Sequence, residues 1–469
     1  MVSIKKNLIY NVIYQILTIA MPLITTPYLS RVMGAEKLGI YSYSYSIAYY
    51  FVLIAMLGLN NYGNREIARV RDDKKQRSRK FWSIYFLQLS IAAVSIACYI
   101  GYCVIFNSDL VSWLMLIYVF SGALDINWFF WGLEEFKITV TRNIIVKILT
   151  ISAILLFVKS SKDLIIYVLI MAVSLTISPL LLWPYLKKRV QWYKPSIQEI
   201  VSHLKPNIIL FIPVIATSLY KVMDKVMLGA MSTYIEVGFY DYSERVIAVP
   251  ICIVNALGTV MLPRMSYLVE NQDKKTEMNM IDYSIILGVA MAASMGFGLM
   301  GVADVFVPFF YGSGYTKCIT LFYILLPSSV FMAAANVIRT QYLIPHGMDL
   351  QFTASVICGA IVNLIVNIIF IPKYGSVGAA IGTLIAEAVV CVYQFVSVKN
   401  LLPISGYIKN IVYLVFSAMI MFGIVSWLPN LGNDIVTIVI KVIAGIIVYA
   451  CALMLMPKYR NIIQNIIYK

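Results

Sequence analysis

Charged residues are scarce in this chain of 469 residues: 13% are Asp, Glu, Lys or Arg, and 61% are hydrophobic. Soluble globular proteins carry about 25% charged and about 45–50% apolar residues. A chain of this length cannot bury such an excess of apolar side chains in one soluble core, so the composition excludes the ordinary globular class. Histidine is scarcer still. His203 and His346 lie far apart in the sequence, which argues against a histidine-based metal site.

Sequence motifs of common enzyme classes are also missing. The chain contains no Walker phosphate loop, no glycine-rich dinucleotide fingerprint, no HExxH and no GxSxG. Its seven cysteines form no CxxC pair and lie in or beside apolar runs, which is typical of small core residues and not of a disulfide frame or metal centre. The sequence therefore predicts a protein that is not an enzyme and holds no metal or other cofactor.

What the chain does contain is a series of apolar runs of about twenty residues, the length that crosses a hydrocarbon core of about 30 Å as a helix. Alternating patterns of about ten residues, the signature of a membrane β-barrel, do not occur. The sequence predicts an all-α integral membrane protein of about fourteen transmembrane helices. The expected helices cover 8–29, 38–60, 81–106, 111–130, 144–158, 164–186, 206–229, 239–262, 282–311, 317–343, 351–371, 375–398, 408–428 and 435–456.

The distribution of basic residues predicts the orientation of these helices. If the N-terminus lies in the cytoplasm, the cytoplasmic segments carry 25 of the 37 Lys and Arg residues and the outer loops carry 6. Positive charge accumulates on the cytoplasmic side of membrane proteins, so we expect a multi-pass protein of the bacterial inner membrane with both termini in the cytoplasm. The net charge of +15 then reflects topology, and no nucleic-acid partner is expected.

Two similar segments indicate an internal duplication. Residues 31–44 and 225–243 each contain a basic residue, Val-Met, a Gly-Ala pair and then Gly-x-Tyr-x-Tyr-Ser. Six predicted helices separate them, so both copies have the same orientation, as in the parallel repeats of several transporter folds. We predict an N-terminal lobe over 1–200, a second six-helix lobe over 201–400, and two additional helices with a cytoplasmic tail over 401–469.

Prolines occur at matching places in the two predicted halves. Pro22 and Pro27 lie in the first predicted helix, and Pro213 lies in the seventh. Proline removes a backbone donor and kinks a helix, and interrupted helices in corresponding positions of two repeats point to a central transport site. The alternative is that these prolines only reflect the high frequency of proline in membrane helices.

Charges inside a membrane cost about 2.5–3.5 kcal/mol each on insertion scales, so they usually face a cavity or a partner. Lys221, Asp224 and Lys225 share one face of the seventh predicted helix, and Arg31 stands at the position that matches Lys225. One interpretation is that these cations fix helix ends in the headgroup region. The other is a cationic lining that binds an anionic diphosphate. The candidate cations are Arg31, Lys221, Lys225, Arg245 and Arg339.

Acidic residues inside predicted helices form a second set of candidates. Asp125 and Glu387 each stand alone in a predicted span. They are candidates for coupling transport to H⁺ or Na⁺, and they fit equally well as hydrogen-bonded structural acids. Asp224 can balance the charge of its two lysine neighbours. The strongly basic segment 65–80 either contacts anionic lipid headgroups or only enforces orientation.

Several segments resemble one known family. Residues 128–137, WFFWGLEEFK, followed by Thr141-Arg142-Asn143, are similar to the signature after the fourth helix of Wzx-type O-antigen and capsule flippases. Further similar segments are 26–34 (TPYLSRVMG), 64–66 (NRE), 224–229 (DKVMLG) and 372–380 (PKYGSVGAA). The resemblance covers nearly the whole chain. Trp131 stands where that family commonly has Gln.

This resemblance implies the fold of the multidrug/oligosaccharidyl-lipid/polysaccharide exporter (MOP) superfamily, with two six-helix lobes and two C-terminal helices. It implies a flippase that moves undecaprenyl diphosphate-linked oligosaccharide repeat units from the cytoplasmic to the periplasmic leaflet by alternating access, for O-antigen or capsule biosynthesis. A polysaccharide polymerase and a chain-length regulator are expected partners. The alternatives are a lipid II flippase, a cation-coupled drug antiporter, a membrane enzyme, or a scaffold of polysaccharide assembly.

Overall fold

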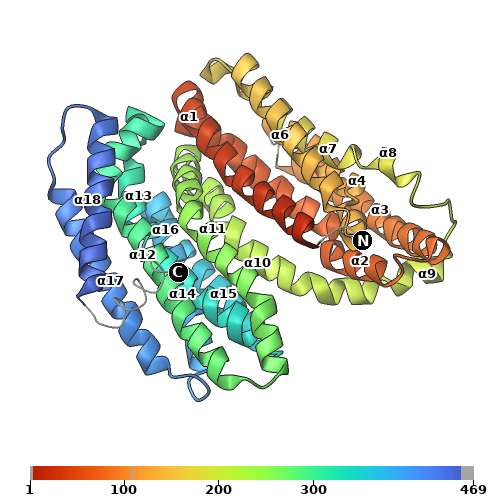
Figure 1. Cartoon of the computed structure of the whole chain (residues 1–469). Helices are drawn as coiled ribbons and strands as arrows, with labels where there is room; N and C mark the ends of the chain where they lie inside the picture. Colours follow the sequence, from red (N-terminus) through yellow and green to blue (C-terminus); the bar gives the residue numbers. More distant parts are fainter. Residues whose placement is uncertain (1–3, 107–108, 456–469) are drawn as a thin grey trace. The chain divides into compact units, whose positions relative to one another are not determined.

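The computed structural model describes residues 4–106 and 109–455, with the side chains of residues 4–21, Pro213, Tyr220 and Lys221 outside the description. All regular secondary structure in this part of the chain is helical (Figure 1). Twelve helical segments within it are long and apolar enough to cross a membrane. The predicted all-α, multi-spanning fold is therefore confirmed.

The chain divides into two compact units, Met1–Gly229 (unit 1) and Ala230–Lys469 (unit 2). The predicted boundary between the two lobes, at residue 200, lies before α10 (Leu204–Met231), and α10 packs as part of unit 1. The predicted division of the chain into three parts stays a prediction.

The helices of unit 1 are α1 (Ile4–Met56), α2 (Leu59–Arg69), α3 (Lys74–Ile105), α4 (Leu110–Leu124), α5 (Asn127–Gly132), α6 (Phe136–Phe157), α7 (Leu164–Leu180), α8 (Trp183–Leu186), α9 (Ile197–Ser202) and α10 (Leu204–Met231).

Unit 2 follows the same pattern of long helices joined by short turns. Its helices are α11 (Tyr234–Glu270), α12 (Lys274–Tyr311), α13 (Lys317–Leu325), α14 (Ser328–Ile338), α15 (Asp349–Tyr374), α16 (Ser376–Ser397), α17 (Ile404–Trp427) and α18 (Asp434–Met454). A π-helical turn, Arg339–Leu343, continues α14. The two additional helices, α17 and α18, pack against α12.

The predicted helix 8–29 and most of the predicted helix 38–60 lie within α1, on either side of Gly34. This residue has φ 73° and ψ 166°, a conformation that favours glycine because it has no Cβ. Pro22 and Pro27 lie inside the helical part of α1, where Gly34 is the position with non-helical dihedral angles. The prolines predict an interruption of the first helix, and the structure has this interruption at Gly34 and not at Pro22 or Pro27. The predicted helix 206–229 corresponds to α10.

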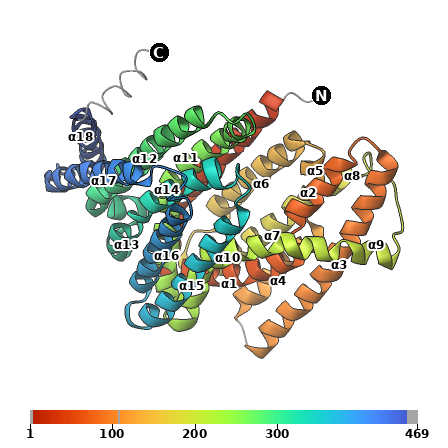
Figure 2. The same ribbon diagram turned by 90° about the horizontal axis from the view of Figure 1, so that it is seen from below.

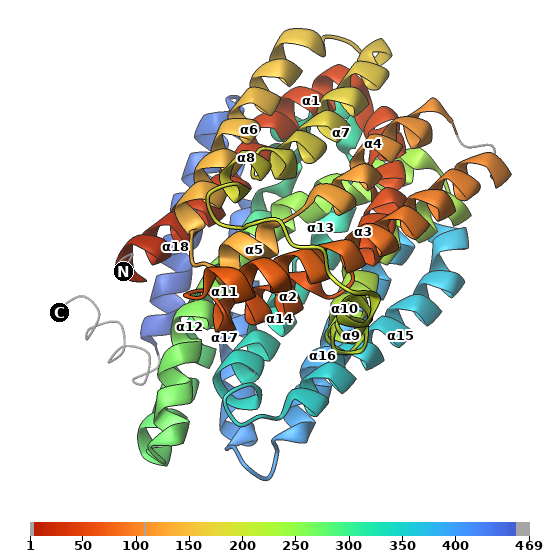
Figure 3. The same ribbon diagram turned by 90° about the vertical axis from the view of Figure 1, so that its right-hand side faces the viewer.

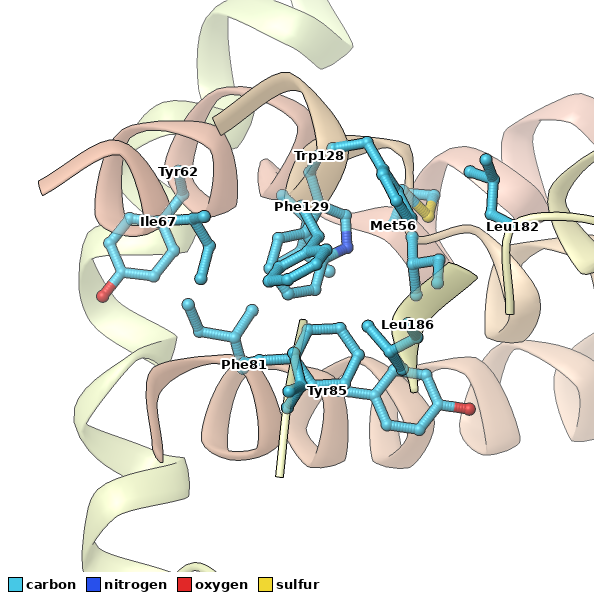
Figure 4. Packing of buried hydrophobic residues seen from close by; sticks show 14 residues of the cluster. Met56, Tyr62, Ile67, Phe81, Tyr85, Trp128, Phe129, Leu182 and Leu186 are labelled. Carbon is cyan, nitrogen blue, oxygen red and sulfur yellow. The ribbon is translucent and has the colours of Figure 1, made fainter. Parts of the chain in front are cut away.

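The hydrophobic core at one end of unit 1 explains why α2 and α5 lie side by side (Figure 3). Side chains from α1, α2, α3, α5 and α8 meet there (Figure 4). The Trp128 ring packs directly on the backbone of Gly63, where a Cβ would come within 2.5 Å of a ring carbon. The labelled members of the cluster are Met56, Tyr62, Ile67, Phe81, Tyr85, Trp128, Phe129, Leu182 and Leu186.

In unit 2, α15 and α16 run side by side over most of their lengths (Figure 2). Gly378 and Gly382 form a GxxxG motif in α16, and such motifs let two helix backbones approach closely. A Cβ on Gly378 would lie 2.5 Å from the backbone of Phe370, and one on Gly382 would overlap the Asn367 side chain. The pairing of these two helices therefore depends on glycine at both positions.

Lys441 of α18 is a buried charge in unit 2. Because it lies in the first half of this helix, its long side chain could be expected to extend the ammonium group to the membrane surface. The structure places this side chain at 1% exposure, with Nζ 3.4 Å from a carboxylate oxygen of Asp304 on α12. Lys441 is therefore an interhelical contact between α18 and α12.

Candidate functional site

The candidate cations of unit 1 occupy α1 and α10. Arg31 lies one turn before the Gly34 kink, with its side chain exposed and its Nη1 donating to the Pro27 carbonyl at 3.1 Å. On α10, Lys225 is half-buried and Asp224 is 2% exposed. The predicted common face of α10 is preserved because the helix is unbroken from Leu204 to Met231. The side chain of Lys221 lies outside the described residues.

Contacts between α10 and the second half of α1 hold these positions within unit 1. The Tyr50 hydroxyl donates to the Ser218 carbonyl at 3.3 Å. One turn beyond Lys225, the backbone of Gly229 packs directly on the Tyr43 ring, and a Cβ there would overlap the ring. The glycine of the repeated sequence segment is thus a close-packing position in α10, whereas its counterpart in α1 is a kink.

Asp125 lies at a helix break and not inside a continuous span. The predicted helix 111–130 is divided into α4 and α5, and Asp125 follows the last residue of α4. One of its carboxylate oxygens accepts from the Asn127 backbone N–H at 2.8 Å and from the Asn127 side-chain amide at 2.6 Å. The carboxylate therefore caps the start of α5. Coupling of transport to this acid stays a prediction.

The same break exposes backbone carbonyls that cannot be left unpaired in a membrane. Gln88 of α3 donates to the carbonyls of Gly122 and Asp125, both at 2.8 Å, and accepts from the Trp128 indole at 3.0 Å. The Trp183 indole donates to the Leu124 carbonyl at 2.9 Å. Side chains from α3 and α8 thus satisfy the freed end of α4, and Gln88 is fully buried.

Arg142 is a buried structural cation. The sequence interpretation counts it among the basic residues of a cytoplasmic connection, but α6 begins at Phe136, so Arg142 lies inside the helix and is 7% exposed. Its guanidinium donates to the Ser178 carbonyl at 2.7 Å and to the side-chain oxygens of Asn127 and Asn143 at 3.0 and 2.6 Å. It joins α6 to α5 and α7.

In unit 2, Arg245 is already paired. It donates to the Asp241 carboxylate one turn earlier on α11, with Nη2 at 2.8 Å and Nε at 3.1 Å. Its guanidinium also lies over the Tyr242 ring, 4.6 Å from the centroid. Asp241 is 5% exposed. The positive charge of Arg245 is therefore largely balanced within its own helix.

Arg339 and Glu387 are brought together in unit 2. Arg339 begins the π-helical turn, and such turns frequently accompany functional sites. Its guanidinium is half-buried and lies 5.6 Å from the centroid of the Phe352 ring. The carboxylate of Glu387 on α16, at 4% exposure, is close enough to act electrostatically on this guanidinium. Two candidates from different predicted helices thus belong to one polar region.

Buried amides surround this region. Asn336, one turn before Arg339, donates to the Asn255 side chain of α11 at 2.8 Å, so it joins two helices. Asn367 donates to Asn363 within α15 at 3.1 Å. Gln341, inside the π-helical turn, is 0% exposed, and neither of its amide atoms has a hydrogen-bond partner among the described groups. Buried polar atoms of this kind are available to a bound group.

The basic segment 65–80 of unit 1 is largely engaged within the protein. Arg71 pairs with Glu134 at 2.7 Å, Arg79 pairs with Glu199, and Arg77 donates to the Arg189 carbonyl at 2.8 Å. These contacts bind α3 to the segments around α5 and α9. The segment therefore also joins parts of unit 1, and its contact with lipid headgroups stays a prediction.

His203, between α9 and α10, is buried at 4% exposure. Ser83 donates its proton to the Arg79 carbonyl, so its Oγ accepts from His203 Nε2 at 3.0 Å, while the Tyr62 hydroxyl donates to Nδ1 at 2.6 Å. Burial, with a smaller effect from Lys80, lowers the pKa of His203 to about 4. The imidazole is therefore neutral at physiological pH and joins α2, α3 and the start of α10.

The residues that sequence reasoning missed are uncharged or counted as loop residues. Gln88 carries no charge and belongs to no motif, so only its position in an apolar run marks it as unusual. Arg142 and Trp128 lie in the signature segments that carry the family resemblance. The structure explains those segments as supports of the α4–α5 break.

Residues 4–269 match the family model described as "Polysaccharide biosynthesis protein". The chain belongs to this family. The match covers more than half of the chain and extends from α1 into the last turn of α11. The expected family is thereby confirmed.

Among curated relatives, the chain is 22% identical to a "Putative O-antigen transporter" of Escherichia coli (strain K12), over 85% of this chain and 97% of the relative. It is 24% identical to a "Probable low-salt glycan biosynthesis flippase Agl15" of Haloferax volcanii, over 69% and 68% of the two chains.

Two solved structures have a similar fold. The lipid II flippase MurJ in an inward closed conformation superimposes with a TM-score of 0.78 at 17% identity, over 97% of this chain and all of that one. An inward-facing MATE family transporter of the MOP superfamily gives 0.61 at 13% identity, over 83% and 96%. The chain therefore has the MOP transporter fold, and its twelve apolar helical segments in the described residues indicate a multi-pass membrane protein.

Proposed function

We propose that this protein is a flippase that moves a lipid-linked oligosaccharide across the membrane during polysaccharide biosynthesis. The membership of the polysaccharide biosynthesis family carries the proposal. The curated relatives, an O-antigen transporter and a glycan biosynthesis flippase, support transport over synthesis. The cargo we propose is an undecaprenyl diphosphate-linked repeat unit of O-antigen or capsule, moved from the cytoplasmic to the periplasmic leaflet of the inner membrane by alternating access.

Arg339 is the cation best suited to the diphosphate. It is half-buried, so its attraction to an anion is less screened by water than that of a surface arginine. A guanidinium also offers several donors in the planar arrangement that phosphate oxygens accept. Gln341, in the same π-helical turn, is buried, and its amide has no hydrogen-bond partner among the described groups. Lys225, with Lys221 and Arg31, forms the corresponding cationic set of unit 1.

Arg245 takes a smaller part in this proposal. Two of its guanidinium N–H groups donate to one carboxylate oxygen of Asp241, and the guanidinium lies over the Tyr242 ring. These contacts leave it little free charge, so a phosphate would have to compete with a carboxylate. Glu387 has the corresponding role for Arg339. In the proposed cycle, its carboxylate neutralises the guanidinium of Arg339 when no cargo is bound. Glu387 and Asp224 are the acids we propose for coupling to H⁺ or Na⁺, ahead of the helix cap Asp125.

Reconstitution tests this function directly. Proteoliposomes containing the purified protein and a fluorescent polyprenyl diphosphate oligosaccharide should expose the label to a membrane-impermeant quencher faster than protein-free vesicles. Arg339→Ala and Lys225→Ala should each slow this transfer at least about tenfold, because each removes a charge-assisted contact with the diphosphate. Arg264→Ala, at an exposed arginine of α11 outside the site, is the matched control.

Three outcomes would argue against the proposal. Equal transfer with and without protein would exclude flipping of this cargo. Faster transfer of labelled lipid II than of the oligosaccharide would favour the alternative of a lipid II flippase. Wild-type transfer by the Arg339→Ala/Lys225→Ala double variant would place the headgroup elsewhere.

A further inference from the structure

Unit 1 contains an apolar cavity of about 550 Å³ at the junction of α3, α7 and α8. The volume lies within the range of about 300–1,000 Å³ that is common for small-molecule pockets. None of the candidate transport residues lines it. The lining residues are Trp82, Leu180, Trp183, Pro184, Leu186, Lys187 and Val190.

Hydrogen bonds fix the aromatic walls of the cavity. The Trp82 indole donates to the Gln191 carbonyl at 2.9 Å, and the Trp183 indole donates to the Leu124 carbonyl at 2.9 Å. Both indole N–H groups are therefore used inside the protein, and the rings offer apolar surface to an occupant. Leu186 and Val190, at 6% and 8% exposure, form the buried floor. The cavity is preformed and suits a hydrocarbon chain.

The rim of the cavity is open and positively charged. Leu180 is 46% exposed, and Pro184 and Lys187 are exposed as well. Lys188 follows as a second exposed cation. Within the described part of the chain, neither lysine forms an ion pair or another resolved electrostatic contact, in contrast to their neighbour Arg189, which pairs with Glu135 at 2.6 Å. Two cations beside an apolar cavity are thus available to an anion.

The position of the cavity agrees with the membrane–water boundary. The predicted span 81–106 begins beside the cavity, and the predicted span 164–186 ends beside it. Both of these span ends lie on the side that the basic residues predict to be cytoplasmic. Trp192 packs on Trp82 with ring centroids 4.4 Å apart and is nevertheless 69% exposed. On α9, Ile197 and Val201 are 79% and 55% exposed. Tryptophans and exposed apolar residues next to lysines are typical of the headgroup region.

We propose that this cavity binds an anionic glycerophospholipid of the cytoplasmic leaflet. One acyl chain would occupy the space between the two tryptophan rings, and Lys187 and Lys188 would bind the phosphate. A polyprenyl chain is several times longer than an acyl chain and fits a cavity of this volume poorly. The charge of the rim favours an anionic over a zwitterionic headgroup. This site is separate from the proposed transport residues and does not depend on their role.

Tryptophan fluorescence tests the proposal on the full-length protein in neutral detergent. Phosphatidylglycerol with a brominated acyl chain should quench the emission saturably, because bromine quenches only indoles that it approaches closely. Brominated phosphatidylcholine should bind about tenfold more weakly. Lys187→Gln/Lys188→Gln should weaken phosphatidylglycerol binding about thirtyfold, from roughly fivefold for each basic residue near a lipid headgroup. Lys137→Gln, at an exposed lysine outside the cavity, should leave binding unchanged.

A second measurement identifies which tryptophan rings the brominated lipid quenches. Trp82→Phe/Trp183→Phe should abolish most of the saturable quenching, whereas Trp113→Phe, at a ring of α4 that is 38% exposed and outside the cavity, should preserve it. Equal affinity for the two headgroups, or unchanged affinity in the double lysine variant, would overturn the proposal. Displacement of phosphatidylglycerol by polyprenyl phosphate at a lower concentration would also overturn it, since the cavity would then belong to the tail of the cargo.

Discussion

Gln88 shows how much a single neutral side chain contributes to the first unit. It is fully buried and bonds to two carbonyls at the end of α4 and to the Trp128 indole. Water does not reach such groups in a membrane interior, so the helix break between α4 and α5 depends on this amide, together with the Trp183 indole, to satisfy the freed carbonyls. Asp125, at the same break, then needs only to cap α5.

Removal of the Gln88 amide should therefore destabilise the protein. Each buried group left without a partner costs about 1–3 kcal/mol, so we expect Gln88→Ala to lower the free energy of unfolding by about 3 kcal/mol. Thermal unfolding in detergent, followed by tryptophan emission, measures the change. Ser90→Ala, two residues along α3 at an exposed position, is the control. Equal shifts in the two variants would contradict the importance of these bonds.

The sequence predicts only part of the candidate site at the level of single residues. The charged residues inside apolar runs can be found from the sequence, and their spacing predicts a common face on α10, which is an unbroken helix. The partner of each charge cannot be found in this way. Arg142 and Lys441 are bound by residues of other helices, and these contacts depend on how distant segments pack.

At the scale of helices, length and hydropathy predict where the chain crosses the membrane, because one apolar run spans one hydrocarbon core. They do not predict where helices break. The breaks after Leu124, after Leu180 and at the π-helical turn interrupt predicted spans without interrupting their apolar character. At the break after Leu124, side chains of other helices satisfy the freed carbonyls, and sequence periodicity carries no signal for such tertiary contacts.

The pairing of α15 with α16 gives a test at this scale. Gly378→Ala would place a methyl group 2.5 Å from the backbone of Phe370, which cannot move as a side chain can. Overpacking of this kind costs about 1–3 kcal/mol, so we expect a lower midpoint of thermal unfolding in detergent. Gly423→Ala in α17 meets open space and should raise stability slightly, since alanine favours helix over glycine. A lowered midpoint in both variants would show that backbone flexibility, and not close packing, is the cause.

At the scale of the whole molecule, the family and the fold follow from sequence segments, while the division into lobes stays a prediction. The duplicated segments predict that α10 begins the second lobe, and in the structure α10 contacts α1 through Tyr50 and Gly229. A repeat in the sequence specifies which helices have the same orientation, but packing decides which of them form one compact body.

The orientation of the chain is the last property that the basic residues predict, and cysteine labelling tests it. In a variant without the seven native cysteines, Asp72→Cys replaces a side chain that is 98% exposed in the segment between α2 and α3. Lys162→Cys, also at an exposed position, lies before α7. Because positive charge is retained in the cytoplasm, a membrane-impermeant maleimide should label position 162 in intact cells and position 72 only after permeabilisation. The reverse pattern would invert the chain, and it would place Lys187 and Lys188 beside the outer leaflet.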